Sequence, residues 1–191
     1  MASNFLDVLS QLHDRDVSFV IVGGVAAALH GGSRVTFDLD IVPSLATDSW
    51  QSAIDVLWSL GARPRIPEPL ERIRDVEQIR RWQRDKGMLA LNLRSPDGST
   101  DVDLLVSEGD RCEALRQRAV RVTVDRRTLF VASIDDLIAM KRLAGRPQDV
   151  LVVWSLIEPS KVRKSLTRSI RSLNPPGKRR GPNPTAFGAE G

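Results

Sequence analysis

One stretch near the N-terminus restricts the fold of this chain more than any other. Residues Phe19–Val42 read FVIVGGVAAALHGGSRVTFDLDIV, in which an apolar run, Phe19 to Val22, meets the pair Gly23 and Gly24 before a run of small helix-forming residues. This order predicts a strand, a tight turn and a helix N-terminus, where backbone N–H groups and the helix dipole favour an anion. Glycine in the turn lets a phosphate group approach the backbone closely.

Two aspartates follow in the next apolar run, where Asp38 and Asp40 flank Leu39. In an extended strand, residues two apart point to the same face and lie about 6–7 Å apart along the chain. At an effective dielectric constant near 20, two negative charges about 6 Å apart repel by roughly 3 kcal/mol. A divalent cation relieves this repulsion, because it binds carboxylate oxygens and bridges to substrate phosphates. The pair therefore predicts a magnesium site.

A later strand offers a third carboxylate. The run from Thr100 to Val106 reads TDVDLLV, in which Asp101 and Asp103 alternate with apolar residues. Asp103 is the better candidate, because it directly precedes the apolar end of the strand. Asp101 lies nearer the preceding turn and is predicted to be solvated.

A lysine on an apolar helix stripe is a further candidate. A helix is expected to begin at Ser133 and to end at Gly145, and Lys141 lies on its apolar side. Such a lysine either extends to the edge of the helix or reaches into a site and meets an anion. We favour the second interpretation, because before residue 160 only Lys86 and Lys141 are lysines. Asp149 follows in the first turn of a further helix, where its charge suits the dipole.

Other segments predict the scaffold around these residues. Expected helices cover Asn4–His13, Asp48–Leu60 with Thr47 as a cap, Leu70–Lys86 and Arg111–Arg118, and the RPRIPEP segment is expected to be a loop. Expected strands are Met88–Leu93 and a hairpin of Val120–Val124 with Thr128–Val131. Strands mixed with helices predict an α/β (α+β) domain over residues 1–171, followed by a disordered tail over residues 172–191.

Length, cysteine content and charge limit the partners. A chain of 191 residues suits one domain, and its single cysteine, Cys112, favours a reducing compartment. We expect a cytoplasmic protein, since no signal peptide or membrane-spanning run is visible. The net charge of +4 comes from residues 161–191, which hold eight Lys or Arg and one acidic residue and leave 20 basic against 23 acidic residues elsewhere. That segment is either an arm for nucleic-acid phosphates or a solubilising extension.

The order of apolar strand, glycine pair, Asp-Leu-Asp and later strand carboxylate resembles the polymerase-beta-like nucleotidyltransferase superfamily. GGVAAALHGGSRVTFDLDIV with DLIAMKRLAGRPQDV is similar to its AbiEii-type branch, which includes abortive-infection and type IV toxin nucleotidyltransferases. The resemblance extends over residues 18 to 155. It implies a mixed sheet flanked by helices and the transfer of a nucleotide from an NTP to an acceptor hydroxyl on RNA or tRNA, protein or a small molecule. An antitoxin partner is implied as well.

The same resemblance assigns roles to single residues. It implies that Gly23 and Gly24 hold the triphosphate, that Asp38 and Asp40 bind two Mg²⁺ ions, that Asp103 completes the carboxylate set, and that Arg34, Lys141 and Asp149 line the nucleotide pocket. The chain departs from the pattern where relatives often have serine at the position of Gly24 and lysine at the position of Gln148. It is also shorter than the larger toxins.

Two other functions are compatible with parts of the sequence. Asp38 and Asp40 fit the Asp-x-Asp signature of haloacid-dehalogenase-like phosphatases, with Asp38 as nucleophile and Asp40 as acid, although the glycine pair then has no role. A non-catalytic module that keeps the fold and binds a nucleotide or RNA is the other alternative. The sequence contains neither G-x-G-x-x-G nor a Gly-Lys-Ser/Thr phosphate loop.

Overall fold

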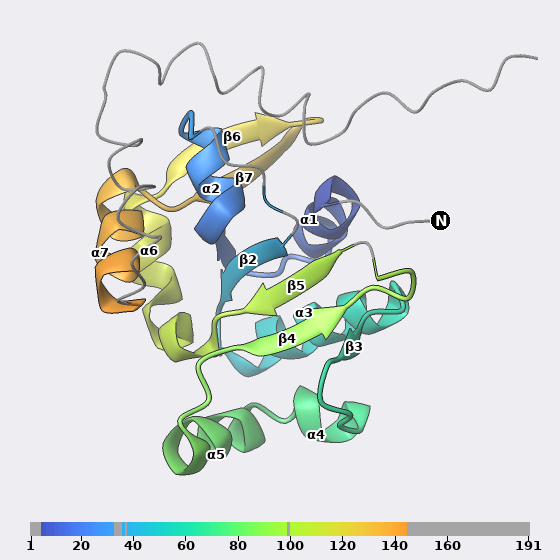
Figure 1. Cartoon of the computed structure of the whole chain (residues 1–191). Coiled ribbons are helices and arrows are strands. Elements are labelled where there is room, and N and C mark those ends of the chain that lie inside the picture. The colour runs from blue at the N-terminus through green and yellow to red at the C-terminus, as the bar shows by residue number, and fades with distance from the viewer. Residues whose placement is uncertain (1–4, 33–35, 37, 99, 145–191) are drawn as a thin grey trace, which may run out of the picture.

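The structure, a computed structural model, describes residues 5–32, 36, 38–98 and 100–144. A seven-stranded sheet with the order β3-β4-β5-β2-β1-β7-β6 runs through the described part, and helices flank it (Figure 1). The strands are β1 Phe19–Ile21, β2 Asp38–Pro43, β3 Arg63–Pro64, β4 Leu91–Arg94, β5 Asp101–Leu104, β6 Val120–Val124 and β7 Arg127–Val131. The helices are α1 Phe5–Asp14, α2 Gly23–Leu29, α3 Thr47–Ser59, α4 Leu70–Arg74, α5 Val76–Lys86, the 3₁₀ helix Val106–Arg111, α6 Cys112–Arg118 and α7 Ile134–Ala144.

The sheet combines parallel and antiparallel pairs. Strand β2 is antiparallel to β1 but parallel to β5, and β1 is parallel to β7. The pairs β3–β4, β4–β5 and β6–β7 are antiparallel. This arrangement confirms the expected mixed sheet with flanking helices.

The two faces of the sheet differ in polarity around β4, β5 and β2. Buried and more exposed residues alternate along β4, β5 and the first four residues of β2, whereas all three residues of β1 are buried. The buried side holds one row of apolar residues from each strand, among them Leu39, Val102 and Leu93. Helix α3 packs against β2 and lies behind the sheet in Figure 1. The polar side of these three strands carries the carboxylates discussed below.

Buried tryptophan anchors the helices to this apolar side. Trp50 of α3 is fully buried, and its indole Nε1 donates a hydrogen bond to the carbonyl of Ile73 in α4 at 2.8 Å. Trp82 of α5 is also buried. Both tryptophans therefore belong to the hydrophobic core.

The prediction of a single helix over Leu70–Lys86 is wrong, because the structure contains two helices there. The chain leaves the helical conformation at Asp75, whose φ and ψ of −75° and 104° are extended. The Asp75 carboxylate accepts a hydrogen bond from the backbone N–H of Glu77 at 2.9 Å and so caps α5. Apolar residues recur at helical spacing through both helices. This pattern therefore gave no sign that Asp75 caps a second helix.

Removal of this cap should destabilise the protein. We expect Asp75→Ala to lower the free energy of unfolding by about 1 kcal/mol, because the first turn of α5 loses a hydrogen-bond acceptor. Asp75→Asn should lose much less, since its amide oxygen still accepts the bond. Urea unfolding of both variants measures the difference, and equal losses would contradict a capping role.

Several other boundaries differ slightly from expectation. Thr47 is the first residue of α3, and Ala46 occupies the cap position without a side-chain hydrogen bond. Part of the segment expected to be a loop forms the short strand β3 at the sheet edge. Ser133 caps α7 as predicted, since its hydroxyl accepts a hydrogen bond from the N–H of Asp136 at 3.1 Å. The predicted tail over residues 172–191 lies outside the described residues. None of the described helices is long and apolar enough to cross a membrane.

Candidate active site

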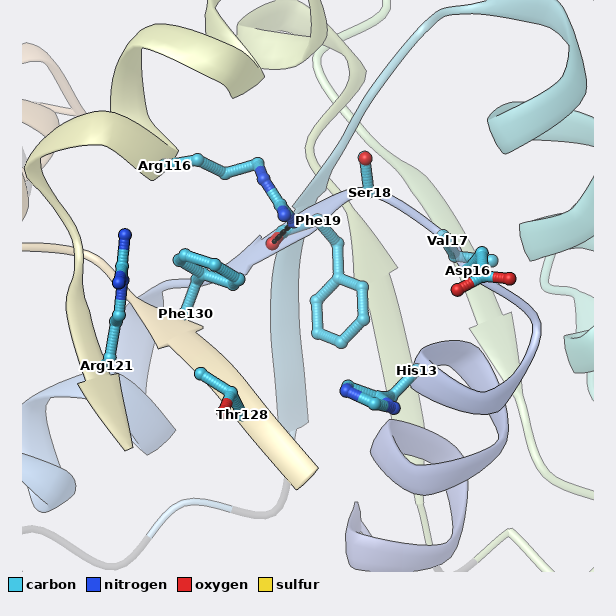
Figure 2. A pocket seen from close by; sticks show the side chains of 9 residues that line it. All are labelled: His13, Asp16, Val17, Ser18, Phe19, Arg116, Arg121, Thr128 and Phe130. Carbon is cyan, nitrogen blue, oxygen red and sulfur yellow. Dashed lines mark hydrogen bonds between the residues drawn. The ribbon is translucent and has the colours of Figure 1, made fainter. Parts of the chain in front are cut away.

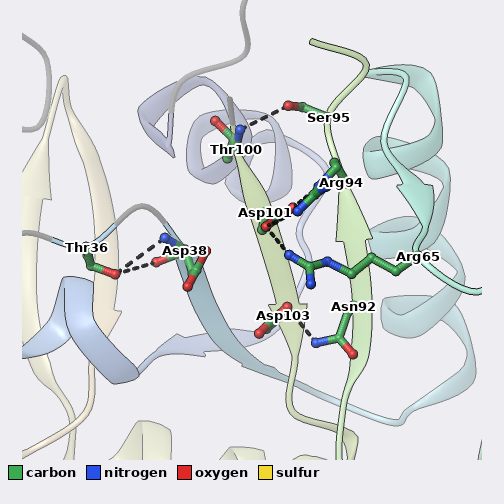
Figure 3. Close-up of polar contacts among 9 residues, drawn as sticks. All are labelled: Thr36, Asp38, Arg65, Asn92, Arg94, Ser95, Thr100, Asp101 and Asp103. Atoms are coloured by element: carbon green, nitrogen blue, oxygen red, sulfur yellow. Dashed lines mark hydrogen bonds and ion pairs between the residues drawn. The ribbon is translucent and has the colours of Figure 1, made fainter. Parts of the chain in front are cut away.

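The strand register brings the sequence-predicted carboxylates into neighbouring positions. In the parallel pair of β2 and β5, Asp38 lies opposite Asp101 and Asp40 lies opposite Asp103. Strand β4 extends both rows, because Asp101 is paired with Arg94 and Asp103 with Asn92. Two polar rows therefore cross three strands on one face: Arg94, Asp101 and Asp38 in the first, and Asn92, Asp103 and Asp40 in the second. Figure 3 shows the first row together with Asn92 and Asp103.

Asp40 has the most unusual electrostatic environment of these groups. The pKa of its carboxyl is raised from 3.8 to about 6, mainly by burial and further by the negative charges of Asp103 and Asp38. A backbone hydrogen bond from Gly24 and the positive charge of Lys141 act in the opposite direction on this pKa. Ionising Asp40 beside two other carboxylates is therefore costly, and a nearby cation reduces that cost.

The glycine turn lies directly against this carboxylate. Gly23 has φ +62°, and a Cβ built on it would come within 2.0 Å of Asp40 Oδ2. A Cβ on Gly24 would come within 2.7 Å of Thr36 Cβ. The predicted turn at the start of α2 is present, and its close approach to the Asp40 carboxylate requires glycine at residue 23. A serine at position 24 would displace Thr36 here.

The remaining predicted residues divide into those that the structure places and those that it does not describe. Lys141, on α7, lies close enough to Asp40 for its charge to lower the pKa of that carboxyl. Arg34 and Asp149 lie outside the described residues. His30, which ends α2, is buried, and its Nε2 lies 2.8 Å from the carbonyl oxygen of Ala132.

The prediction that Asp101 is solvated is wrong. Its side chain is only 13% exposed and forms ion pairs with Arg94 and Arg65. Arg94 Nε donates to Oδ1 at 2.8 Å and Nη2 to Oδ2 at 3.1 Å, while Arg65 Nη2 donates to Oδ2 (Figure 3). These hydrogen bonds, first that from Arg94, hold the pKa of Asp101 below its usual value. Sequence analysis missed both arginines, although Arg94 alternates with apolar residues as the carboxylates do.

Asp38, Asp40 and Asp103 are the described residues that could hold magnesium. Among residues 5–32, 36, 38–98 and 100–144, no three His, Cys, Asp or Glu side chains gather closely enough to form a complete metal-ligand set. Mg²⁺, however, is commonly held by one or two carboxylates together with water and substrate phosphates. Asp40, with its raised pKa, and the neighbouring Asp38 and Asp103 provide the oxygen ligands that such an ion prefers. These residues therefore fit magnesium that enters with a nucleotide.

A separate hollow of about 430 Å³ lies elsewhere on the molecule (Figure 2). It lies beside the start of β1, and Phe19 at that start pairs with Pro43 at the far end of β2 from Asp38. In this hollow the Arg116 guanidinium stacks over the Phe130 ring, 4.0 Å from its centroid, and donates to the Phe19 carbonyl at 3.3 Å. The hollow shares no residue with the carboxylate face.

Comparisons with known proteins give distant likenesses. No protein-family model and no curated protein sequence matches this chain. A crystal structure of an antigenic nucleotidyltransferase-like protein from Paracoccidioides brasiliensis is 20% identical and has a TM-score of 0.47, with 87% of this chain and 83% of that chain covered. The solution structure of the antibiotic-resistance factor ANT(2'')-Ia is 17% identical and has a TM-score of 0.45, with 87% of this chain and 80% of that chain covered.

Proposed function

We propose that this protein is a magnesium-dependent nucleotidyltransferase, which moves a nucleoside monophosphate from an NTP to an acceptor hydroxyl. The observation that carries the proposal is the register of β2 and β5, which sets Asp40 beside Asp103 and Asp38 beside Asp101 on one polar face. The contact of Gly23 with Asp40 and the effect of Lys141 on its pKa add a turn and a cation next to the carboxylates. Carboxylates for magnesium beside groups for phosphate are the elements that phosphoryl transfer requires.

In this scheme Asp38, Asp40 and Asp103 would hold two Mg²⁺ ions, which would supply positive charge to balance the triphosphate. Lys141 and the glycine turn would bind the phosphates that leave. The acceptor oxygen forms a bond to the α-phosphorus, and the bond from that phosphorus to the β-phosphate oxygen breaks, so that pyrophosphate departs with the electron pair. Asp103 accepts the hydroxyl proton, and the hydrogen bond from Asn92 Nδ2 at 2.8 Å orients its carboxylate.

Nucleotide binding tests the proposal before the acceptor is known. Calorimetry with Mg²⁺ and α,β-methylene-ATP should detect binding to the wild type and at least about tenfold weaker binding to Asp38→Asn and Asp103→Asn, since each loses a charged ligand. Asp135→Asn, which removes an exposed carboxylate from α7, should bind like the wild type. The assay should be repeated with the GTP, CTP and UTP analogues.

Transfer itself is measured by incubating the protein and α-³²P-NTP with total RNA, protein extract or small hydroxyl compounds. Label should appear in one class of acceptor and should be absent with Asp38→Asn. If no nucleotide binds in a metal-dependent manner and no label is transferred, the proposal is wrong.

The non-catalytic alternative has one observation in its favour, namely the lack of a complete metal-ligand set among the described residues. It predicts nucleotide binding that is unchanged by chelation of magnesium and by Asp38→Asn. The phosphatase alternative receives no such support. It expects the aspartates at the end of a strand, whereas Asp38 is the first residue of β2. A toxin role and an antitoxin partner rest on the sequence resemblance alone.

A further inference from the structure

We infer that Arg65 and Arg94 form the binding site for the acceptor, and that this acceptor carries a phosphate group next to the hydroxyl that is modified. The inference rests on the proposed nucleotidyl transfer. It names the class of acceptor that would approach the carboxylates of β2 and β5 from the side of β3 and β4.

The position of the two arginines relative to the carboxylates comes from the strand register. Arg94 on β4 is paired with Asp101, which is paired with Asp38, and therefore the three residues form one row across the sheet. Neighbouring strands are about 4.8 Å apart, so the backbone of Arg94 lies about 10 Å from that of Asp38. The charge of Asp38 contributes to the raised pKa of Arg94, after the larger effects of Asp101. Arg65 joins the row from just beyond β3, where its backbone N–H donates to the carbonyl of Asn92 at 3.0 Å.

The sheet order places the arginines and the glycine turn on opposite sides of the carboxylates. Strands β5 and β2 carry the carboxylates, β4 and β3 lie on one side of them, and β1, which leads into the turn at Gly23, lies on the other. In an in-line displacement, the attacking oxygen approaches the phosphorus from the side opposite to the leaving group. If pyrophosphate leaves toward the turn and Lys141, the acceptor arrives from the side of Arg65 and Arg94.

The hydrogen bonding of the two arginines leaves donors available for a ligand. Their side chains are 51% and 52% exposed, whereas the shared Asp101 side chain is 13% exposed. In the part of the chain that the structure describes, their recorded side-chain hydrogen bonds use only Nε and Nη2 of Arg94 and Nη2 of Arg65, all with Asp101. Asp101 thus fixes two guanidinium groups and neutralises one of their two charges. A fixed pair of guanidinium groups suits a phosphate, which accepts several N–H bonds in a planar, bidentate arrangement.

Binding of a defined RNA measures this site separately from catalysis. Fluorescence anisotropy should be recorded with a fluorescein-labelled, single-stranded 12-nucleotide RNA bearing a free 3′ hydroxyl, in Mg²⁺ and without NTP. Arg65→Gln should weaken binding on the order of tenfold, because one charged hydrogen-bond donor to phosphate is lost. This variant keeps the bidentate pair of Arg94 with Asp101, and so the fold should persist. Arg94→Lys, which keeps the charge without the fork, should also weaken binding.

Controls separate a phosphate site from a structural ion pair. Arg84→Gln removes an exposed arginine from α5 and should leave RNA affinity unchanged. In a plot of log Kd against log salt concentration, the slope for Arg65→Gln should be smaller than that of the wild type by about 0.7, the value expected for one phosphate contact on a single strand. Ribose 5-phosphate distinguishes the source of the phosphate: competition by it identifies a small phosphate ester as sufficient, and its failure to compete identifies a nucleic-acid strand.

Equal RNA affinities of the wild type, Arg65→Gln and Arg94→Lys would overturn the inference, as would equal binding of an uncharged methylphosphonate strand. Because the RNA assay contains no nucleotide, this outcome leaves the calorimetric test of NTP binding unaffected. Conversely, absence of NTP binding with an intact arginine effect on RNA would contradict the proposed transfer while leaving the phosphate site in place.

Discussion

Replacing Asp40 by asparagine is expected to stabilise the metal-free protein and to abolish nucleotide transfer. Burial and the charges of Asp103 and Asp38 raise the pKa of Asp40 from 3.8 to about 6 in the folded state. A raised carboxyl pKa means that the folded protein binds the proton more tightly than the unfolded chain, and stability is therefore lost as pH rises from about 4 to 6. At pH 8 the variant should regain up to about 3 kcal/mol, since one pKa unit corresponds to roughly 1.4 kcal/mol.

The same substitution should reduce transfer by at least about 1,000-fold, or roughly 4 kcal/mol, because the charged carboxylate that we propose to hold the metal is lost. Thermal unfolding at pH 8 and pH 4 without metal measures the stability, and the gain should be confined to the higher pH. Added Mg²⁺ and nucleotide analogue should raise the melting temperature of the wild type and not that of the variant. A loss of stability at pH 8 would show that the ionised Asp40 carboxylate does not destabilise the folded protein. Asp135→Asn serves as the neutral control.

The second large effect is expected from Gly23→Ala. Gly23 and Gly87 share a φ of +62°, but a Cβ on Gly87 would meet nothing within 4 Å, whereas a Cβ on Gly23 would lie 2.0 Å from Asp40 Oδ2. Alanine at either position costs about 1–2 kcal/mol for the left-handed backbone. At Gly23 the overlap with Asp40 should add about 1–3 kcal/mol and displace the carboxylate. Gly87→Ala is therefore a control with the same backbone strain and an open side-chain space.

Urea unfolding and calorimetry with Mg²⁺ and the nucleotide analogue separate the two variants. Gly23→Ala should lose more stability than Gly87→Ala and at least about tenfold in nucleotide affinity, whereas Gly87→Ala should bind the nucleotide normally. Combining Gly23→Ala with Asp40→Ala should cost less than the sum of the single changes, because the two residues share a contact. Strictly additive costs would show that the turn and the carboxylate do not depend on each other.

The sequence predicted most of the scaffold because its periodic signals are local. Alternation marked β2, β5 and the hairpin of β6 with β7, and helical spacing marked α1, α3 and α7. The break between α4 and α5 at Asp75 could not be predicted from the apolar stripe, which continues past it. A cap depends on the φ and ψ of one residue. Strand β3 could not be predicted either, since two residues are too few to show an alternation of apolar and polar residues.

The candidate site could be predicted only in part, because strand pairing is not a local property. The spacing of Asp38 and Asp40 placed them on one face, but the sequence alone did not show that β5 lies parallel to β2 in a register that sets Asp103 beside Asp40. The same limit hid Arg94 and Arg65, whose significance depends on their shared partner Asp101. The available signal was Arg94, which directly follows the predicted strand Met88–Leu93 and continues its alternation of apolar and polar residues.

The parallel pairing of β2 with β5 also determines when this site can exist during biosynthesis. Asp38 and Asp40 leave the ribosome long before β5, since α3, α4, α5 and β4 are made between the two strands. Closing so long a loop is costly, and contacts between residues distant in sequence tend to form slowly. The emerging N-terminal segment thus carries Asp38 and Asp40 without Asp101 and Asp103, and a nascent chain acquires this face of four carboxylates only after β5 has joined the sheet.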